Sequence, residues 1–157
     1  MMIEEADLQN EKDRHDIIRL NEDFAVVSKA KLAEDHFEGL NELLRTHPTI
    51  FAFLARDEQG EAIGYALCHF TITSFSAGRA ANVHDVFVAE GTRGKGVGRA
   101  LMERFEAKAR HEGCRKITLE VSHDNKRAQG LYEALGFGDD HPECDGNGTW
   151  YWFKMLD

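Results

Sequence analysis

One glycine-rich loop, set between a β-type segment and a helical segment, most constrains how this chain can fold. Residues 83–88 are rich in β-branched and aromatic residues, a polar loop spans 89–92, and Arg93-Gly94-Lys95-Gly96-Val97-Gly98 leads into an apolar-periodic helix that starts near Gly98. The first N–H groups of a helix lack intrahelical partners and carry partial positive charge, and glycines let the backbone approach an anion closely. Arg93, Lys95 and Arg99 add formal positive charge. The pattern therefore predicts a loop that binds a diphosphate.

Two widespread phosphate-binding motifs do not fit this loop. A Walker A loop would need a glycine at position 89 and a serine or threonine at position 96, where the chain has Ala89 and Gly96. A dinucleotide fingerprint that starts at Gly94 would need a glycine where Arg99 stands. The pattern that remains over residues 93–98, Gln/Arg-x-x-Gly-x-Gly/Ala, resembles the acetyl-CoA-binding motif of the GCN5-related N-acetyltransferase (GNAT) superfamily. Taken alone, such a loop is also typical of an ordinary β–α turn.

A second segment makes the resemblance more specific. Residues 125–137 read Asn125-x-x-Ala128-x-x-Leu131-Tyr132-x-x-Leu135-Gly136-Phe137, which is similar to the other recurring GNAT signature. This segment lies one expected strand after the glycine-rich loop, in the order that the family shows. The resemblance covers residues 50–137 and implies an α/β fold of the GNAT type. In that fold a central mixed, mostly antiparallel sheet contains a splayed parallel strand pair and is flanked by helices.

Hydrophobic periodicity and turn residues predict the order of the elements. Helices are expected over residues 10–28, 33–45, 98–111 and 126–135. Strands are expected over residues 3–8, 50–55, 62–70 with an extension through 71–75, 82–88, 116–121 and 149–155. The β–α–β order around the glycine-rich loop indicates a parallel strand pair. No repeat or linker divides the sequence, so we expect a single domain over residues 1–157.

Composition and charge narrow the classes of protein and partner. The formal net charge of −9 disfavours nucleic acid as the main partner, and it suits either a cationic substrate or simple solubility. Cys68, Cys114 and Cys144 are widely spaced, which favours a reduced, cytoplasmic location over a disulfide framework. His123, His141 and Cys144 match no common metal-site spacing, so no metal is expected. No apolar run is long enough to span a membrane, so no membrane partner is expected either.

The resemblance implies how acetyl-CoA would bind. The pantetheine arm would pair with the exposed backbone of Val86, Phe87 and Val88 where the parallel strands splay, and a backbone N–H near Val86 would stabilise negative charge on the thioester oxygen. The backbone N–H groups that would hold the pyrophosphate belong to Arg93, Gly94, Lys95, Gly96, Val97, Gly98 and Arg99. Tyr132 is implied both as a cofactor contact and as the general acid that protonates the CoA thiolate. Asn125 either contacts the cofactor or orients a turn.

The acceptor amine must lose a proton before it attacks. Because an alkylammonium ionises near pH 10, its deprotonation at neutral pH costs about 4 kcal/mol. Candidate bases are His84, Asp85 and Glu120, and His84 is favoured because a histidine titrates in the useful range. His84 and Asp85 should point to opposite faces of a pleated strand, so we expect only one of them to face the acceptor. Alternatively, His84 is a partly buried histidine that has no role in catalysis.

These observations predict a GNAT-type N-acetyltransferase that transfers acetyl from acetyl-CoA directly to a primary amine. The expected acceptor is a small molecule: a polyamine, an aminoglycoside-like compound or an amino-acid derivative. A protein N-terminal or lysine acetyltransferase is one alternative, and a non-catalytic acyl-CoA-binding sensor is another. The aromatic run Trp150-Tyr151-Trp152 indicates a strand covered on both faces, a homodimer interface or an aromatic wall for a cationic acceptor.

Overall fold

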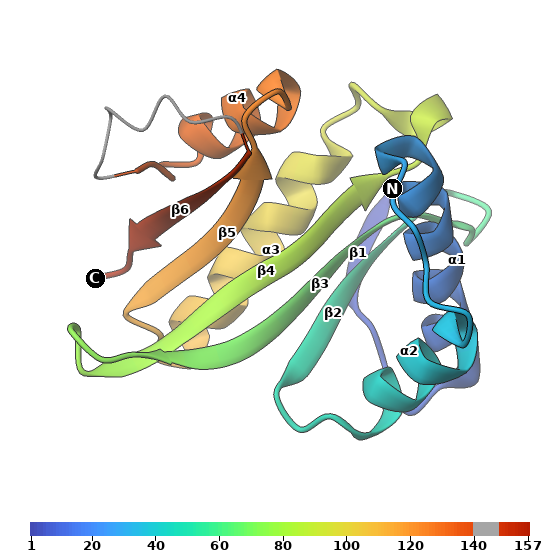
Figure 1. Cartoon of the computed structure of the whole chain (residues 1–157), viewed down its shortest axis with the longest axis horizontal. Helices are drawn as coiled ribbons and strands as arrows, with labels where there is room; N and C mark the ends of the chain where they lie inside the picture. Colours follow the sequence, from blue (N-terminus) through green and yellow to red (C-terminus); the bar gives the residue numbers. More distant parts are fainter. Residues whose placement is uncertain (140–147) are drawn as a thin grey trace.

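The fold is a six-stranded mixed sheet with helices on both faces (Figure 1). The computed structural model describes residues 1–139 and 148–157. The strands follow one another across the sheet in chain order, and they are β1 (Met2–Glu5), β2 (Ile50–Arg56), β3 (Ala62–Thr73), β4 (Gly78–Val88), β5 (Lys116–Ser122) and β6 (Thr149–Met155). The helices are α1 (Glu11–Ser28), α2 (His36–Thr46), the 3₁₀ helix η1 (Glu90–Thr92), α3 (Val97–His111) and α4 (Lys126–Ala134). Among the described helices, none combines the length and apolar character that a membrane crossing requires.

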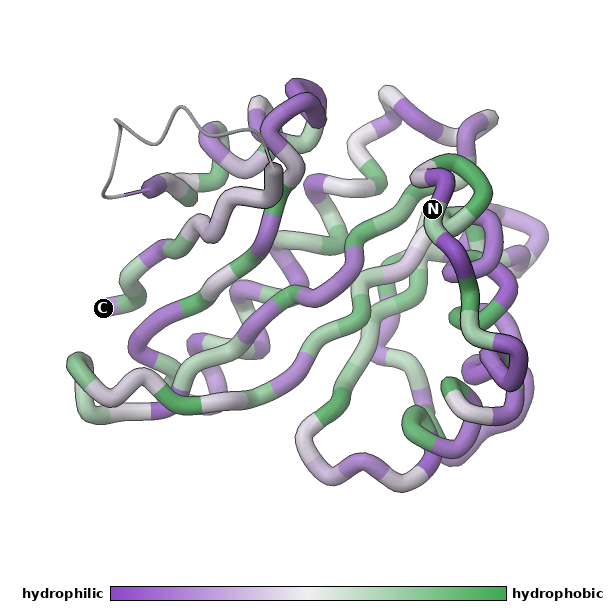
Figure 2. Tube along the Cα trace, in the orientation of Figure 1, coloured by the Kyte–Doolittle hydropathy of each residue, from purple (hydrophilic) through white to green (hydrophobic). Residues whose placement is uncertain are grey.

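Each face of the sheet has its own apolar core. One core lies under α3 and α4 and contains Leu101, Phe105 and Tyr132, whereas the other lies under α1 and α2 and contains Ile17 and Leu44. Figure 2 shows apolar residues concentrated along the central strands and hydrophilic residues on the outer turns of α1. The helices therefore form because each buries one apolar stripe against the sheet.

A buried arginine fixes α1 against the edge of the sheet. The Arg56 guanidinium on β2 donates to Asp13 and Asp16 of α1 at 2.7 and 2.8 Å, and it also pairs with Glu4 of β1. Three carboxylates thus satisfy the donors of one guanidinium that is almost fully removed from water. Because these contacts hold the first half of α1, Asn21 and Phe24 in its second half contact Asp85 and Phe87 of β4.

The parallel pair β4 and β5 separates partway along its length. Residues 80–83 of β4 pair with residues 116–119 of β5, and no pairing between the two strands extends beyond Val83 in the described part of the chain. Both strands continue past this point, to Val88 and Ser122. All other strand pairs are antiparallel, so the expectation of a mixed sheet with a splayed parallel pair is confirmed.

The turn between β3 and β4 differs from the sequence-based prediction. The predicted break over residues 76–79 is shorter than expected, because β4 already begins at Gly78 and pairs with Thr73 at the end of β3. β3 and β4 therefore form a long hairpin whose tip carries the exposed side chains of Ile72 and Phe75. The sequence also favours an extended segment from Phe137 and a loop over residues 141–148. Gly138 forms a bridge with Phe153, and residues 140–147 lie outside the described part of the chain.

Candidate active site

The glycine-rich loop ends in a helix start with free backbone donors. Gly94 and Gly96 both adopt φ of +79°, and Gly96 is the N-terminal cap residue of α3. No described residue accepts a hydrogen bond from the backbone N–H groups of residues 94–99, and no side chain caps the helix. A Cβ atom at either glycine would meet open space, so the backbone conformation, rather than crowding, calls for glycine here. The arrangement suits an anion.

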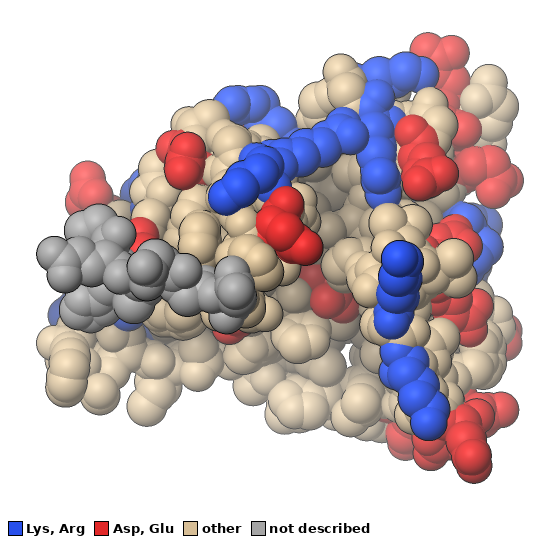
Figure 3. Space-filling view, turned by 45° about the horizontal axis from the view of Figure 1, so that its top comes forward, with Lys and Arg blue, Asp and Glu red and all other residues tan. Residues whose placement is uncertain are grey.

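The basic side chains near the loop differ in their contacts and exposure. Arg93 turns back toward β4, where its Nε donates to the Val88 carbonyl at 3.0 Å and its guanidinium lies 5.6 Å from the Phe87 ring centroid. Arg99 pairs with Glu103 at 3.5 Å on the surface of α3, and Lys95 is exposed. Figure 3 shows Lys and Arg side chains gathering at the edge of the molecule where this loop and the start of α4 lie. Positive charge therefore surrounds the free donors in a chain with net charge −9.

The second signature segment forms helix α4 beside the splay. The side chain of Asn125 caps this helix by accepting a hydrogen bond from the Ala128 N–H at 3.2 Å. This contact agrees with the expectation that Asn125 orients a turn. Tyr132 is 8% exposed and packs edge-on against Phe137, with 6.1 Å between the ring centroids. Burial, with a smaller contribution from the Asp85 charge, raises the pKa of Tyr132 to about 12. The hydroxyl therefore keeps its proton at neutral pH.

The prediction that His84 and Asp85 point to opposite faces is wrong. The β3–β4 register shifts so that Val83 pairs with Cys68 while Asp85 pairs with the adjacent Leu67, which makes His84 the extra residue of a β-bulge. Val83 and Val86 pack on the α3 side, whereas Phe87 packs on the α1 side. His84 and Asp85 consequently lie on one face, that of α1, with His84 exposed and Asp85 largely buried.

Asp85 belongs to a polar cluster that sequence reasoning missed. The Tyr65 hydroxyl donates to the Asp85 carboxylate at 3.2 Å, and Asn21 Nδ2 donates to the Tyr65 hydroxyl at 2.8 Å and to Asp85 at 3.3 Å. Burial raises the pKa of Asp85, and the nearby His84 and the Tyr65 hydrogen bond lower it by less. Burial and the Asp85 charge also raise the pKa of Tyr65. No local signal could reveal the cluster, because its three members come from α1, β3 and β4.

Replacing Asp85 with asparagine is expected to stabilise the protein at neutral pH. The raised pKa means that the folded state binds the Asp85 proton more tightly than the unfolded chain, so ionisation lowers the free energy of unfolding as pH rises. Asparagine keeps an oxygen acceptor for Tyr65 without the charge. We expect Asp85→Asn to raise Tm by about 2–4 °C at neutral pH, with the gain shrinking toward the ordinary aspartate pKa of about 3.9. Thermal unfolding of both proteins from about pH 4 to pH 7 measures this difference in Tm. A lower Tm for Asp85→Asn at neutral pH would contradict the argument that burial disfavours the charge.

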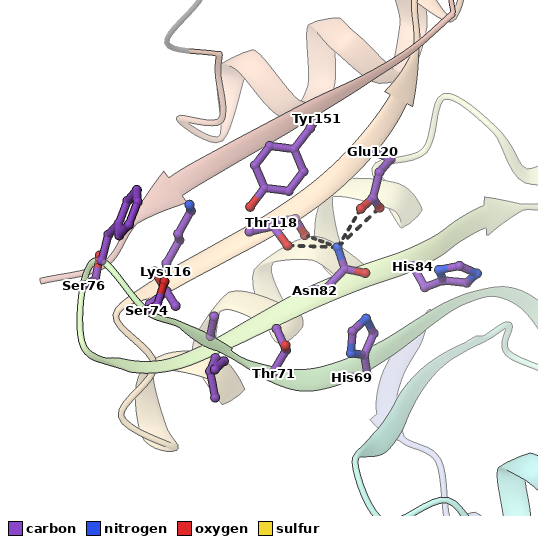
Figure 4. Close-up of a pocket in the computed structure, with 14 residues that line it drawn as sticks. His69, Thr71, Ser74, Ser76, Asn82, His84, Lys116, Thr118, Glu120 and Tyr151 are labelled. Atoms are coloured by element: carbon purple, nitrogen blue, oxygen red, sulfur yellow. Dashed lines mark hydrogen bonds between the residues drawn. The ribbon is translucent and has the colours of Figure 1, made fainter.

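An open cleft lies on the same face, beyond the part of β4 that α1 covers. It has a volume of about 500 Å³, and its lining comes from the β3–β4 hairpin, β5 and β6. His84 and Glu120 line one end of the cleft, near the splay, and Lys116 lies toward the hairpin tip (Figure 4). Asn82 Nδ2 donates to Thr118 Oγ1 at 2.9 Å and to the Glu120 carboxylate at 3.3 Å, which orients Glu120. The sequence signal for this wall is the alternation of Lys116, Thr118 and Glu120 along β5.

Metal-binding side chains do not cluster in the described part of the chain. His123 Nδ1 lies 2.9 Å from the Gly148 N–H, which joins the end of β5 to the start of β6. His141 and Cys144 lie outside the described residues. Cys68 and Cys114 are buried free thiols.

Comparison with known proteins agrees with this geometry. Residues 14–137 match the acetyltransferase (GNAT) family. The thialysine N-epsilon-acetyltransferase of Bos taurus is 31% identical over 164 residues, which cover 99% of this chain and 92% of that protein. The uncharacterized N-acetyltransferase YhfO of Bacillus subtilis (strain 168) is 33% identical over 97 residues. That alignment covers 62% of this chain and 64% of YhfO, less than two thirds of either protein.

Solved structures share the fold. A chain from the crystal structure of the NatC complex bound to Gag peptide and CoA superposes with a TM-score of 0.74 at 20% identity, with 100% of both chains covered. The chain described here belongs to the GNAT family of acetyltransferases. The free donors of the glycine-rich loop, the splayed strands and the cleft beside them are the parts of the fold from which a site can be built.

Proposed function

We propose that this protein is an acetyl-CoA-dependent N-acetyltransferase that acts on the primary amine of a small molecule by direct attack. The observation that carries the proposal is the run of backbone N–H groups over residues 94–99, near the β4–β5 splay, that find no acceptor among the described residues. These donors fit a pyrophosphate, and the unpaired backbone of residues 84–88 on the β5 side fits an extended pantetheine arm. Tyr132 packs in the core on the α3 face of the sheet, whereas His84 lines the cleft on the opposite face.

In the proposed mechanism each residue supplies one step. The β4–β5 pairing stops at Val83, so the backbone near Val86 borders the splay, where an N–H can donate to the thioester oxygen as negative charge develops. Tyr132 donates its proton to the departing sulfur, and its raised pKa keeps that proton available. His84 or Glu120 accepts the amine proton from the cleft side, directly or through water. The buried Asp85 adds negative charge that favours a cationic acceptor.

A small acceptor is favoured over a protein acceptor by two observations. The cleft has a volume of about 500 Å³, the size of a small-molecule site, and the Bos taurus relative carries the name of an enzyme that acts on thialysine. The NatC chain with Gag peptide supports the peptide alternative at the level of the fold. Comparing free amines with peptides of matched side chains separates the two acceptor classes.

Calorimetric titration with acetyl-CoA, followed by free-thiol release across a panel of amines, tests the proposal. We expect saturable binding and thiol release with one class of primary amines. Binding without release on any amine or peptide would favour a non-catalytic sensor of acyl-CoA. An absence of binding would overturn the assignment of the glycine-rich loop.

Replacing His84 with glutamine is expected to lower kcat/KM by about 10²–10⁴-fold if the imidazole is the general base. Glutamine keeps similar length and polarity at an exposed position, so the fold should be unaffected. The dependence of kcat/KM on pH should also change in this variant. Glu120→Gln is the matched variant: if its loss exceeds that of His84→Gln and the pH profile follows it, Glu120 is the base instead.

We further propose that two copies associate as a homodimer. Strand β6 ends the sheet, where Tyr151 and Met155 are exposed, and Ile72 and Phe75 are exposed at the hairpin tip, which supports this proposal. Sedimentation over a range of concentrations measures the association, and a monomer at every concentration would overturn it.

A further inference from the structure

Lys116 lines the cleft and has no carboxylate partner among the residues that the structure describes. Lys12, Lys108 and Lys154 pair with Asp16, Glu5 and Glu106 at 2.7–2.8 Å. Lys116 is half-buried at the start of β5, and its Nζ lies 4.6 Å from the ring centroid of Phe153 and 5.6 Å from that of Tyr151. No acidic residue in the described segments 1–139 and 148–157 pairs with it. The rings hold the side chain in place, and no carboxylate of the described residues neutralises its positive charge, which suits an anion.

The two ends of the cleft carry opposite charge. Lys116, Thr118 and Glu120 alternate along β5, so their side chains share one face, and Lys116 and Glu120 start about 13 Å apart at about 3.3 Å per residue. Glu120 and His84 lie at the splay, where the reaction takes place under the proposed function. Lys116 lies at the far end, toward the hairpin tip (Figure 4). Both residues line the cleft, so a molecule with an amine at one end and a carboxylate at the other can contact both of them.

We propose that Lys116 binds the carboxylate of a zwitterionic acceptor, and that the substrate is a diamino acid of about the size of lysine. This inference rests on the proposed function of the same cleft. The acceptor's reactive amine faces Glu120 and His84, and its α-carboxylate pairs with Lys116. Reversing the ligand would place its carboxylate beside Glu120, so the charges of the cleft also set its direction.

Neutral groups around Lys116 suit the same ligand. Thr71, Ser74 and Ser76 line this end of the cleft and can donate to a carboxylate or accept from an α-amino group. Arg115 Nη1 donates to the Ser76 carbonyl at 2.8 Å, which holds the hairpin tip beside the start of β5. A polyamine would bring a second ammonium group against Lys116, where like charges repel. The cleft therefore selects against a polyamine and for a diamino acid.

The decisive comparison uses L-lysine and cadaverine, which differ only in the α-carboxylate. We expect the wild-type kcat/KM for lysine to exceed that for cadaverine by about 10- to 100-fold, as a charge-assisted contact of this kind predicts. Lys116→Met should remove this preference by lowering the value for lysine and raising that for cadaverine, because the like charge that repels its second ammonium group is gone. Lys116→Arg should keep most of the preference because it keeps the charge. Lys12→Met, the same change on the exposed side of α1, is the control and should change neither value.

A binding measurement separates this inference from the proposed function. Both amines are titrated into protein saturated with CoA, which needs no turnover. Tighter binding of lysine that Lys116→Met abolishes would support the carboxylate subsite even if no thiol were released, in which case only the proposed catalysis would fail. Equal or tighter binding of cadaverine by the wild type, no binding of either amine, or an equal loss of both in Lys116→Met would overturn the subsite. Thermal unfolding of each variant confirms that the fold is retained.

Discussion

Gly96→Asp is expected to abolish measurable acetyl-CoA binding. Gly96 caps α3 at φ +79°, and the neighbouring backbone N–H groups have no acceptor among the described residues. An aspartate there places a carboxylate where the pyrophosphate is proposed to bind. Two unit charges about 4 Å apart at an effective dielectric constant of about 20 repel by about 4 kcal/mol, which corresponds to a loss of affinity on the order of 10³-fold. Calorimetric titration of the variant with acetyl-CoA measures the loss.

Two variants isolate the charge from the backbone strain in this experiment. Gly96→Asn adds the same bulk at the same position without the charge, and asparagine tolerates positive φ better than most residues, so we expect only about a tenfold loss. Gly113→Asp introduces the charge and the strain at φ +74° after the other end of α3, where a Cβ also meets open space. It should lower stability and leave affinity unchanged. Retained affinity in Gly96→Asp would remove the glycine-rich loop from the cofactor site.

Tyr132→Phe is expected to lower kcat by about 10²–10⁴-fold, the usual contribution of a positioned general acid. The ring of Tyr132 packs in the core against Phe137, and phenylalanine preserves that packing. The hydroxyl, whose pKa is raised to about 12, is the only group removed. The Kd for acetyl-CoA should therefore stay within about twofold, because the lost interaction forms mainly as the sulfur departs. Single-turnover thiol release and calorimetry on the same sample measure the two quantities.

The Tyr132 result also distinguishes two structural explanations. If kcat and acetyl-CoA affinity fall together, Tyr132 contributes to cofactor binding rather than to proton transfer. Unchanged turnover would remove Tyr132 as the acid and leave the thiolate to depart unprotonated or to take its proton from water. Because Asp85 contributes to the raised pKa of Tyr132, Asp85→Asn combined with Tyr132→Phe also shows whether the two residues act together.

Local patterns in the sequence determined most of the architecture. Helical periodicity and turn residues placed each helix and strand within a few residues, because these signals depend on near neighbours along the chain. The glycine-rich loop was predictable for the same reason: positive φ at Gly94 and Gly96 and the free donors of α3 follow from residues within one turn. Asn125 as the cap of α4 is likewise a local property.

Only the tertiary structure decided which side chains meet at the cleft. The β-bulge that places His84 and Asp85 on one face depends on the register between β3 and β4, and strand alternation alone predicted the opposite. The contact of Asp85 with Tyr65 and Asn21 joins residues up to 64 positions apart. Whether Lys116 has a carboxylate partner among the described residues depends on which acidic side chains the fold brings near it. These features rest on pairing between distant segments, and no local pattern of residue types encodes that pairing.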